Sequence, residues 1–467
     1  MRHQISGSNV STSVNVGSEI RVAELAPPLA MRSALRQGPP RTLTSGSPET
    51  RSDAKLSRRR RLYLGMLGPG IMAMLANNDA GGMMSYALTG KLFGITLFLP
   101  LLLLLVPVGY SIQEMSMRLS AVTRKGYPEL LNGQFGTMAR YSSVSVLVAT
   151  NILYVIAEFA GMTAGLETFG APIWVADVLS FGSVSAVMLL SGTRTKQRLM
   201  LLVGGINCAF IVVTILMGVH GENAPGLAVW SMDAGANGGT PLSTFVVAAI
   251  GNAVAPFMLY FGSGSTLDSR MRVRDVRVGQ IDVALGAILQ SIFAAAVVVC
   301  GAELAKLTNN AVLSPRDLIG DLTVVAGRVA GDLFAVGLFN AGLLAAVTIS
   351  FSSAYAVAGS QSEAMRRNPE ISRTQKFYRT YFGSLLIGAV AVLLPGMPLG
   401  MTAVCAQIAG AALLVPDLIF LVLLTSNGEI MGWHANTLRK TAIGWGIVIL
   451  YSATAIATLI VMMRNFV

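Results

Sequence analysis

A carboxylate flanked by amides and glycines interrupts the first long apolar segment of the chain. The residues are Asn77-Asn78-Asp79-Ala80-Gly81-Gly82, near the centre of a stretch long enough to cross a membrane. A charge and helix-weakening glycines are costly in a helix that faces lipid, so we expect them to face protein or a water-filled cavity. The pattern predicts an ion or substrate site. The alternative is a tilted helix that carries a buried, neutralised Asp79.

A second apolar segment is interrupted at Gly251-Asn252-Ala253-Val254-Ala255-Pro256. Pro256 lacks a backbone donor and disfavours the helical conformation of Ala255, which alone would indicate only a kink. Broken helices in corresponding positions of two halves indicate a transporter of inverted repeats with its site at the membrane midplane. The two interruptions together therefore predict an ion site between broken helices one and six.

The composition places both interruptions in a membrane. Hydrophobic residues make up 53% of the 467 residues and charged residues only 12%, which is typical of a polytopic helical membrane protein and excludes an aqueous protein or an outer-membrane barrel. Hydropathy and Gly/Pro breaks predict eleven spans, near 63–92, 94–119, 141–168, 172–192, 199–219, 242–266, 278–303, 330–358, 377–396, 399–425 and 442–463.

An odd number of spans in the first repeat places the second repeat in the opposite orientation across the membrane. Eleven spans therefore divide into two inverted five-helix repeats and one extra helix. We therefore predict four parts: a disordered, basic cytosolic tail over 1–62, a first repeat over 63–219, a second, inverted repeat over 242–425, and an eleventh helix over 442–463. If the tail is cytosolic, 29 of the 34 Lys and Arg residues lie on the cytosolic side. This predicts a multi-pass protein of the cell (inner or plasma) membrane with a cytosolic N-terminus and an extracytosolic C-terminus.

The chain lacks the residues that several other classes of protein would need. The three cysteines stand alone in apolar segments, and the three histidines lie in the tail or loops. No phosphate-binding loop or interleaved basic and aromatic patch is present, so we expect neither nucleotide nor nucleic-acid partners. An intramembrane enzyme would require clustered catalytic groups, and an amino-acid transporter would place Asp79 against the substrate carboxylate. We expect no enzymatic activity and no cofactor; the partners are divalent metal ions and the lipid bilayer, and the oligomeric state stays open.

At its two helix interruptions, and in several later stretches, the chain resembles the NRAMP family of divalent-metal transporters. Gly68-Pro69-Gly70 followed by Asp79-Ala80-Gly81-Gly82 is similar to the family's Gly-Pro-Gly and Asp-Pro-Gly-Asn, and residues 113–123 are similar to its second-helix ending. Ile281-Asp282-Val283-Ala284, Ala406-Gln407-Ile408 and Leu424-Thr425-Ser426 are similar to later stretches. The resemblance implies an all-α membrane protein of the LeuT-type fold, with two inverted five-helix repeats, an eleventh helix, and helices one and six broken at the midplane.

The chain departs from the family at the metal ligands. The family holds its metal with an Asp and an Asn of the first helix, a main-chain carbonyl at an Ala of the sixth, and a Met sulfur three residues further on. The resemblance implies the following correspondences: Asp79 keeps the Asp, Gly82 replaces the Asn, Asn252 replaces the Ala, Ala255 replaces the Met, Phe257 replaces a His, Gln407 is retained and Leu413 replaces a second Gln.

These replacements change the ion that we expect. Without the soft thioether only oxygen ligands remain, and the small residues Gly82 and Ala255 are expected to enlarge the cavity. Such a site suits a partly hydrated Mg²⁺, which dehydrates reluctantly. We expect the metal site to be formed by Asp79, Ala80, Gly82, Gly251, Asn252 and Ala255, with Ala80 and Gly251 contributing main-chain carbonyl oxygens. Hydration or second-layer contacts are expected from Asn77, Asn78 and Gln407.

The pattern resembles the NRAMP-related magnesium transporter branch, whose members are taken to move Mg²⁺, and also Mn²⁺, without proton coupling. Phe257 and Val155 stand where the family has titratable residues, whereas Glu158 aligns with a family acid. Glu158 is therefore either a paired structural carboxylate or a residual proton-path group. We expect uptake of Mg²⁺ and Mn²⁺, as substrates, by alternating access without proton coupling. The alternative is a proton-coupled Mn²⁺ or Fe²⁺ symporter of the NRAMP type.

Overall fold

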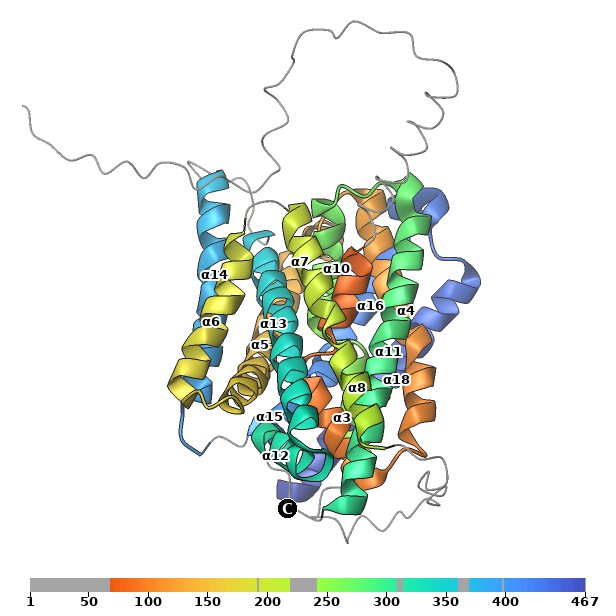
Figure 1. Cartoon of the computed structure of the whole chain (residues 1–467). Helices are drawn as coiled ribbons and strands as arrows, with labels where there is room; N and C mark the ends of the chain where they lie inside the picture. Colours follow the sequence, from red (N-terminus) through yellow and green to blue (C-terminus); the bar gives the residue numbers. More distant parts are fainter. Residues whose placement is uncertain are drawn as a thin grey trace, which may run out of the picture. The chain divides into compact units, whose positions relative to one another are not determined.

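The computed structural model describes residues 68–190, 193–218, 242–308, 314–359, 369–396 and 399–466. All regular secondary structure in these ranges is helical (Figure 1). The predicted tail over 1–62 lies outside the described residues. The helices are α2 (Pro69–Ala76), α3 (Ala80–Phe93), α4 (Phe98–Thr123), α5 (Tyr127–Glu167), α6 (Ile173–Leu189), α7 (Thr193–Gly205), α8 (Cys208–Leu216), α9 (Leu242–Ala253), α10 (Pro256–Asp268), η3 (Val273–Asp275), α11 (Val276–Leu307), α12 (Pro315–Ala326), α13 (Arg328–Gly359), α14 (Pro369–Val392), α15 (Leu399–Leu413), α16 (Val415–Ser426), α17 (Gly428–Met431), η5 (Gly432–His434) and α18 (Leu438–Phe466).

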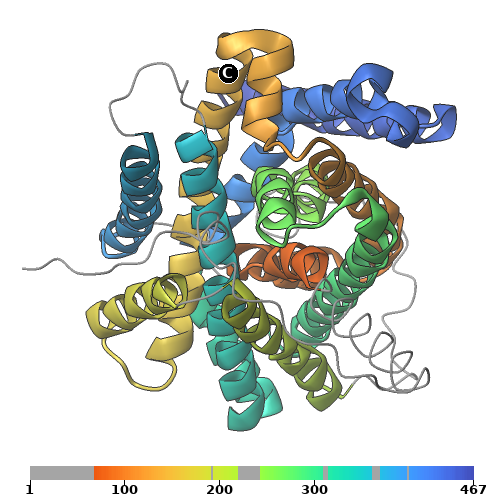
Figure 2. The same ribbon diagram turned by 90° about the horizontal axis from the view of Figure 1, so that it is seen from above.

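Both predicted helix breaks are present. The first-span break, residues 77–79, separates α2 from α3, and the sixth-span break, residues 254–255, separates α9 from α10. Ala255 is extended (φ −91°, ψ 152°) directly before Pro256, as the steric restriction on a residue before proline requires. Seen from above, the orange-red α2–α3 segment and the green α9–α10 segment lie side by side near the centre, with other helices around them (Figure 2).

The first turn of α2 is held by a carboxylate from a distant helix. The amides of Gly68 and Gly70 donate hydrogen bonds to the two carboxylate oxygens of Asp282 on α11, at 2.8 and 2.6 Å. Gly68 has a φ of +137°, which side chains rarely adopt, and a Cβ on Gly70 would lie 2.8 Å from the side chain of Val283. Asp282 thus satisfies first-turn amides that have no partner within the helix, and it anchors α2 to α11.

Two elements differ from the predicted spans. The tenth span is bent by 41° between α15 and α16, where Pro416 occupies the first turn of α16. Between the seventh and eighth spans, α12 forms a short helix with Leu318, Ile319 and Leu322 buried, and hydropathy misses it because its other face is charged. The four predicted parts of the chain remain a prediction.

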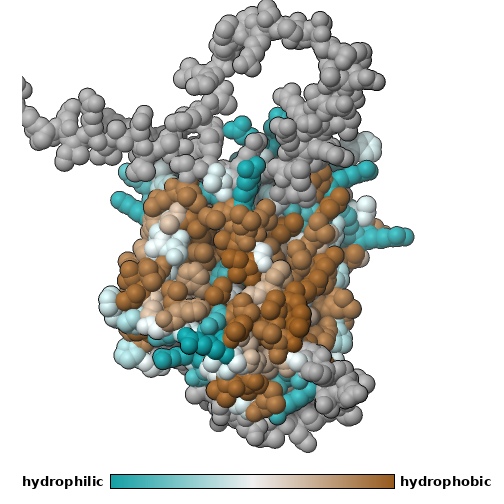
Figure 3. Space-filling view, in the orientation of Figure 1, coloured by the Kyte–Doolittle hydropathy of each residue, from teal (hydrophilic) through white to brown (hydrophobic). Residues whose placement is uncertain are grey.

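The helical body has the surface of a membrane protein. In the described ranges, seven helices are long and apolar enough to cross a membrane, or eight if the bent pair α15–α16 forms one span. The other predicted spans correspond to the broken α2–α3 pair, to α6 and to α14. Apolar residues cover most of the face in Figure 3, and hydrophilic residues gather mainly toward its two ends.

Candidate metal site

Asp79 lies at the first-span break and is completely buried. It is the N-cap of α3, and its Oδ1 accepts a hydrogen bond from the amide of Gly82. Gln407 on α15 donates from Nε2 to both carboxylate oxygens of Asp79, at 3.3 and 3.4 Å. The carboxylate is therefore held between the broken first span and α15.

The side chain of Asn252 reaches Asp79 from the sixth-span break. A Cβ built on Gly82 would lie 2.4 Å from Oδ1 of Asn252 and 2.6 Å from Oδ1 of Asp79. The expectation that Gly82 enlarges the cavity is therefore wrong here, because the amide of Asn252 fills the space. Both polar atoms of this buried amide lack a hydrogen-bond partner in the described part of the chain. An unpaired buried amide is costly, so an amide oxygen without a partner beside the Asp79 carboxylate suits a bound cation.

Asn77 and Asn78 tie the two breaks together. Nδ2 of Asn77 donates to the main-chain carbonyls of Asn252 and Ala253, and Nδ2 of Asn78 donates to the carbonyl of Gln290 on α11 at 3.1 Å. Within the described residues, Oδ1 of each Asn is buried without a hydrogen-bond partner. Their amide nitrogens are therefore structural, and contact with the ion's waters remains a prediction for their oxygens.

We predicted the main-chain carbonyls of Ala80 and Gly251 as ligands, and they differ in whether the helix already uses them as hydrogen-bond acceptors. Ala80 lies in the first turn of α3, where carbonyls accept intrahelical hydrogen bonds and amides are free, so its carbonyl is not the free ligand that we expected. Gly251 lies in the last turn of α9, where carbonyls have no intrahelical partner. It packs closely on α15, since a Cβ there would lie 2.2 Å from the carbonyl oxygen of Gln407.

Glu158 on α5 faces the start of α3. Its Oε2 accepts a hydrogen bond of 2.7 Å from the amide of Ala80, and the side chain is completely buried. This contact places a negative charge at the positive end of a half-helix, as in a structural cap. Among the described residues its Oε1 has no hydrogen-bond partner, so a residual role in a proton path stays a prediction.

The positions of the missing soft and basic ligands are closed by apolar side chains. Ala255 is the N-cap residue of α10 and is completely buried. Phe257 packs edge-on against Tyr154, with ring centroids 6.2 Å apart. In the described ranges no three His, Cys, Asp or Glu side chains form a metal-binding group. The arrangement offers one carboxylate at the break together with amide and main-chain oxygens.

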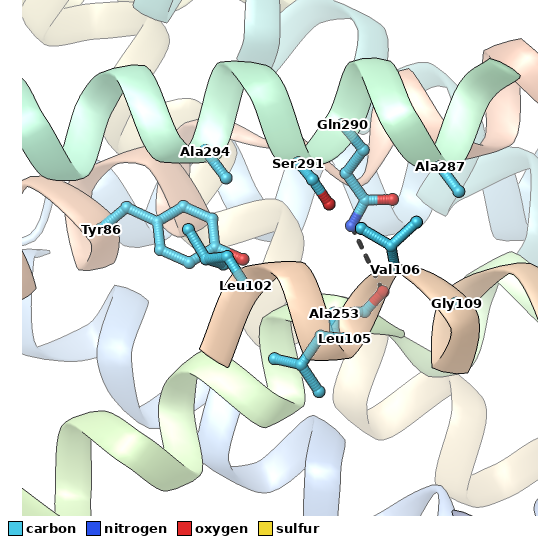
Figure 4. Close-up of a pocket in the computed structure, with 10 residues that line it drawn as sticks. All are labelled: Tyr86, Leu102, Leu105, Val106, Gly109, Ala253, Ala287, Gln290, Ser291 and Ala294. Carbon is cyan, nitrogen blue, oxygen red and sulfur yellow. Dashed lines mark hydrogen bonds between the residues drawn. The ribbon is translucent and has the colours of Figure 1, made fainter. Parts of the chain in front are cut away.

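Sequence reasoning missed two residues of this network. The hydroxyl of Tyr154 donates to Oε1 of Gln407 at 3.0 Å, which turns the amide nitrogen of Gln407 toward Asp79. Nε2 of Gln290 donates to the carbonyl of Ala253 at 3.2 Å (Figure 4). Two signals could have found them: Tyr154 precedes Glu158 by one helical turn, and Gln290 is a lone amide within an apolar span.

Two bacterial transporters are similar to this chain over most of its length. The "Divalent metal cation transporter MntH" of Mycobacterium tuberculosis is 25% identical over 435 residues, which cover 86% of this chain and 92% of the relative. The MntH of Bacillus subtilis is 25% identical over 433 residues, covering 88% of this chain and 96% of the relative.

Solved structures match the fold. A variant of the Eremococcus coleocola manganese transporter superposes with a TM-score of 0.71 at 18% identity, covering 91% of this chain and 90% of that chain. A nucleobase-cation-symport-1 family transporter in a closed conformation superposes with a TM-score of 0.55 at 14% identity, covering 85% and 91%. These neighbours confirm the predicted LeuT-type fold.

The family assignment rests on a match that covers most of this chain's own sequence. Residues 70–461 match the family described as Nramp, natural resistance-associated macrophage protein-like. This range includes both helix breaks, Asp79 and Gln407. The chain therefore belongs to the Nramp family, whose members are transporters and not enzymes.

Proposed function

We propose that this protein transports divalent cations, Mg²⁺ and also Mn²⁺, by alternating access and without proton coupling. The ion binds between the first-span and sixth-span breaks. The observation that most supports this proposal concerns Asp79 and Asn252, whose side chains are both completely buried. The side-chain amide of Asn252 has no hydrogen-bond partner among the described residues. Family membership and the relatives called divalent metal cation transporters support the substrate class.

The chemistry of the donors supports a hard cation. Carboxylate, amide and carbonyl oxygens suit Mg²⁺ and Mn²⁺, whereas soft sulfur ligands select other metals. Ala255 and Phe257 offer neither sulfur nor imidazole at the sixth-span break. The C-terminal ends of α2 and α9 also converge there, and their partial negative charges attract a cation.

A proton-coupled Mn²⁺ or Fe²⁺ symporter is the second candidate, and one contact favours it. Glu158 lies against the amide of Ala80, next to Asp79, and one of its oxygens is buried without a hydrogen-bond partner among the described residues. A carboxyl group beside the ion site is a suitable proton carrier. The identity of the Eremococcus coleocola neighbour as a manganese transporter agrees with Mn²⁺ as a substrate.

Uptake into proteoliposomes tests the proposal. Influx of Mg²⁺ and Mn²⁺ is measured at a fixed inside-negative potential together with internal pH, for the parent, Asp79→Ala and Asp177→Asn. Asp177 is a matched control, because it is a buried carboxylate on α6, which packs on α5, α13 and α14 away from the breaks.

We expect both ions to enter without acidification, Asp79→Ala to abolish uptake, and Asp177→Asn to retain it. Acidification that depends on the metal would instead support the symporter. Full uptake by Asp79→Ala would contradict the site itself.

A further inference from the structure

The carbonyl oxygens at the end of α9 are already engaged by side chains from two other elements. The carbonyl of Ala253 accepts hydrogen bonds from Nδ2 of Asn77 at 3.3 Å and from Nε2 of Gln290 at 3.2 Å. The carbonyl of Asn252 accepts one from Asn77. A carbonyl oxygen has two lone pairs, so both lone pairs at Ala253 are in use.

These contacts draw the end of α9 toward α11. Figure 4 shows Gln290 reaching from α11 to the carbonyl of Ala253, at a small pocket that Ser291 and Tyr86 also line. The main-chain carbonyls are thus bound on this side of the sixth-span break. The side chain of Asn252 lies next to Gly82, where a Cβ would also meet Oδ1 of Asp79.

The tie to α11 is itself supported from the first-span break. Nδ2 of Asn78 donates to the main-chain carbonyl of Gln290 at 3.1 Å. Gln290 therefore accepts from the first span and donates to the sixth, and it is nearly buried, at 7% exposure. One residue on α11 therefore contacts both breaks, the first through its main-chain carbonyl and the sixth through its side chain.

We propose that Gln290 is a positioning residue that determines which oxygen the sixth-span break presents to the ion. By holding the Ala253 carbonyl, it keeps the main chain turned toward α11 and leaves the Asn252 amide as the ligand from α9. This inference rests on the proposed function, and it concerns the selectivity of that same site.

Loss of the hydrogen bond from Gln290 changes selectivity in a definite direction. A released end of α9 can turn its carbonyls toward the ion, which adds main-chain ligands in place of water. Mg²⁺ gives up its waters reluctantly. The KM for Mg²⁺ therefore rises more than the KM for Mn²⁺.

The test uses Gln290→Met, which has nearly the same shape but no donor. Initial rates of Mg²⁺ and Mn²⁺ uptake by the full chain in proteoliposomes give both KM values. We expect the ratio of the Mg²⁺ KM to the Mn²⁺ KM to rise by about threefold to tenfold, the value of one hydrogen bond. Ser291→Ala is the matched control, since Ser291 is the next residue on α11 and lines the same pocket, and it leaves the ratio unchanged.

A double variant tests whether Gln290 acts through Asn252. If it does, Asn252→Ala/Gln290→Met has the same KM ratio as Asn252→Ala, because the ligand that Gln290 positions is already gone. Independent effects that multiply in the double variant would overturn the proposal. An equal change of both KM values in Gln290→Met would do the same, because it would indicate a purely structural role.

Two further readouts keep the outcomes distinct. If little Gln290→Met reaches the membrane, Gln290→Leu replaces it, since leucine is apolar and also lacks the donor; an unchanged KM ratio in Gln290→Leu would overturn the proposal. A parent protein that takes up neither ion would contradict the proposed function. A parent that takes up both, with a ratio unmoved by loss of the donor, would contradict only the positioning role.

Discussion

The amide beside Asp79 comes from α9 rather than from α3. Gly82 leaves space on α3, and the side chain of Asn252 occupies it, with its oxygen 2.4 Å from where a Cβ on Gly82 would be. The two positions are therefore sterically linked, although they are far apart in the chain. A side chain at one of them excludes the present side chain at the other.

This link predicts the behaviour of Gly82→Asn. The added side chain overlaps Asn252, and overpacking of this kind costs about 1–3 kcal/mol, so Mg²⁺ and Mn²⁺ uptake per folded protein falls by about tenfold. In Gly82→Asn/Asn252→Ala the overlap is relieved and uptake exceeds that of Gly82→Asn alone. Uptake assays on the two variants and the parent check this, and equal impairment of both variants would refute the link.

Tyr154 orients Gln407, and this predicts a second outcome. Tyr154→Phe removes the donor to Oε1 of Gln407, so the amide nitrogen is no longer held toward Asp79. We expect the KM for both metals to rise by about threefold to tenfold, the value of one hydrogen bond. Tyr381→Phe is the control in the same kinetic assay, because its hydroxyl donates to the carbonyl of Val184 on α6, away from Asp79. Equal effects of the two substitutions would count against this role.

Part of the site could be predicted from residue types alone. A carboxylate among glycines predicts a site at Asp79, the resemblance to the family adds Asn252, and the structure brings both side chains next to Gly82. The expected roominess at Gly82 and the free carbonyl at Ala80 were wrong. Both depend on how one helix end approaches another, and a local pattern does not record the packing of residues so distant in the chain.

At the scale of elements, the two broken spans are held by side chains from unbroken helices. Asp282 on α11 binds the start of α2, and Glu158 on α5 binds the start of α3. Half-helix N-termini carry unpaired amides and partial positive charge, so carboxylates stabilise them. The breaks are therefore rigid features rather than frayed segments.

Asp282→Ala is predicted to destabilise the fold. It removes two hydrogen bonds from amides to a carboxylate, each worth about 1.5–3 kcal/mol, so we expect a loss of about 3 kcal/mol or more. Asp317→Ala is the comparison: it removes the exposed hydrogen bond from the Ser314 amide to the Asp317 carboxylate at the start of α12, and costs about 1 kcal/mol. Denaturant unfolding in detergent measures both, and a loss for Asp282→Ala no greater than for Asp317→Ala would contradict the anchoring role.

Sequence reasoning was most successful where a residue dictates backbone geometry. Pro256 and the glycines near Asp79 predicted both breaks, because their effects on the backbone are local. Pro416 also marked the bend between α15 and α16, and it was passed over within a strongly apolar run. The amphipathic α12 was missed because a hydropathy window averages its buried and charged faces.

At the scale of the whole molecule, the candidate site lies inside the helical body. Asp79, Glu158 and Asn252 have no exposed surface. Elsewhere, Lys91 on α3 pairs with Asp321 on α12 at 2.9 Å, and Glu114 pairs with Arg118 within α4 at 2.9 Å. The proposed alternating access requires the helices around this buried site to move apart on one side at a time.

The proposed mechanism fixes the charge moved per cycle. A dication that crosses alone is driven by about 2.3 kcal/mol per charge for each 100 mV, so Mg²⁺ gains about twice that. A tenfold concentration gradient is worth about 1.4 kcal/mol. The potential that stops net flux should then shift by about 30 mV per tenfold Mg²⁺ gradient.

The most direct test is the reversal potential of Mg²⁺-dependent current in proteoliposomes, measured with and without a tenfold proton gradient. We predict a shift of about 30 mV per tenfold Mg²⁺ gradient, with no change when the proton gradient is imposed. A reversal potential that moves with the proton gradient would contradict uncoupled transport and establish the symporter instead.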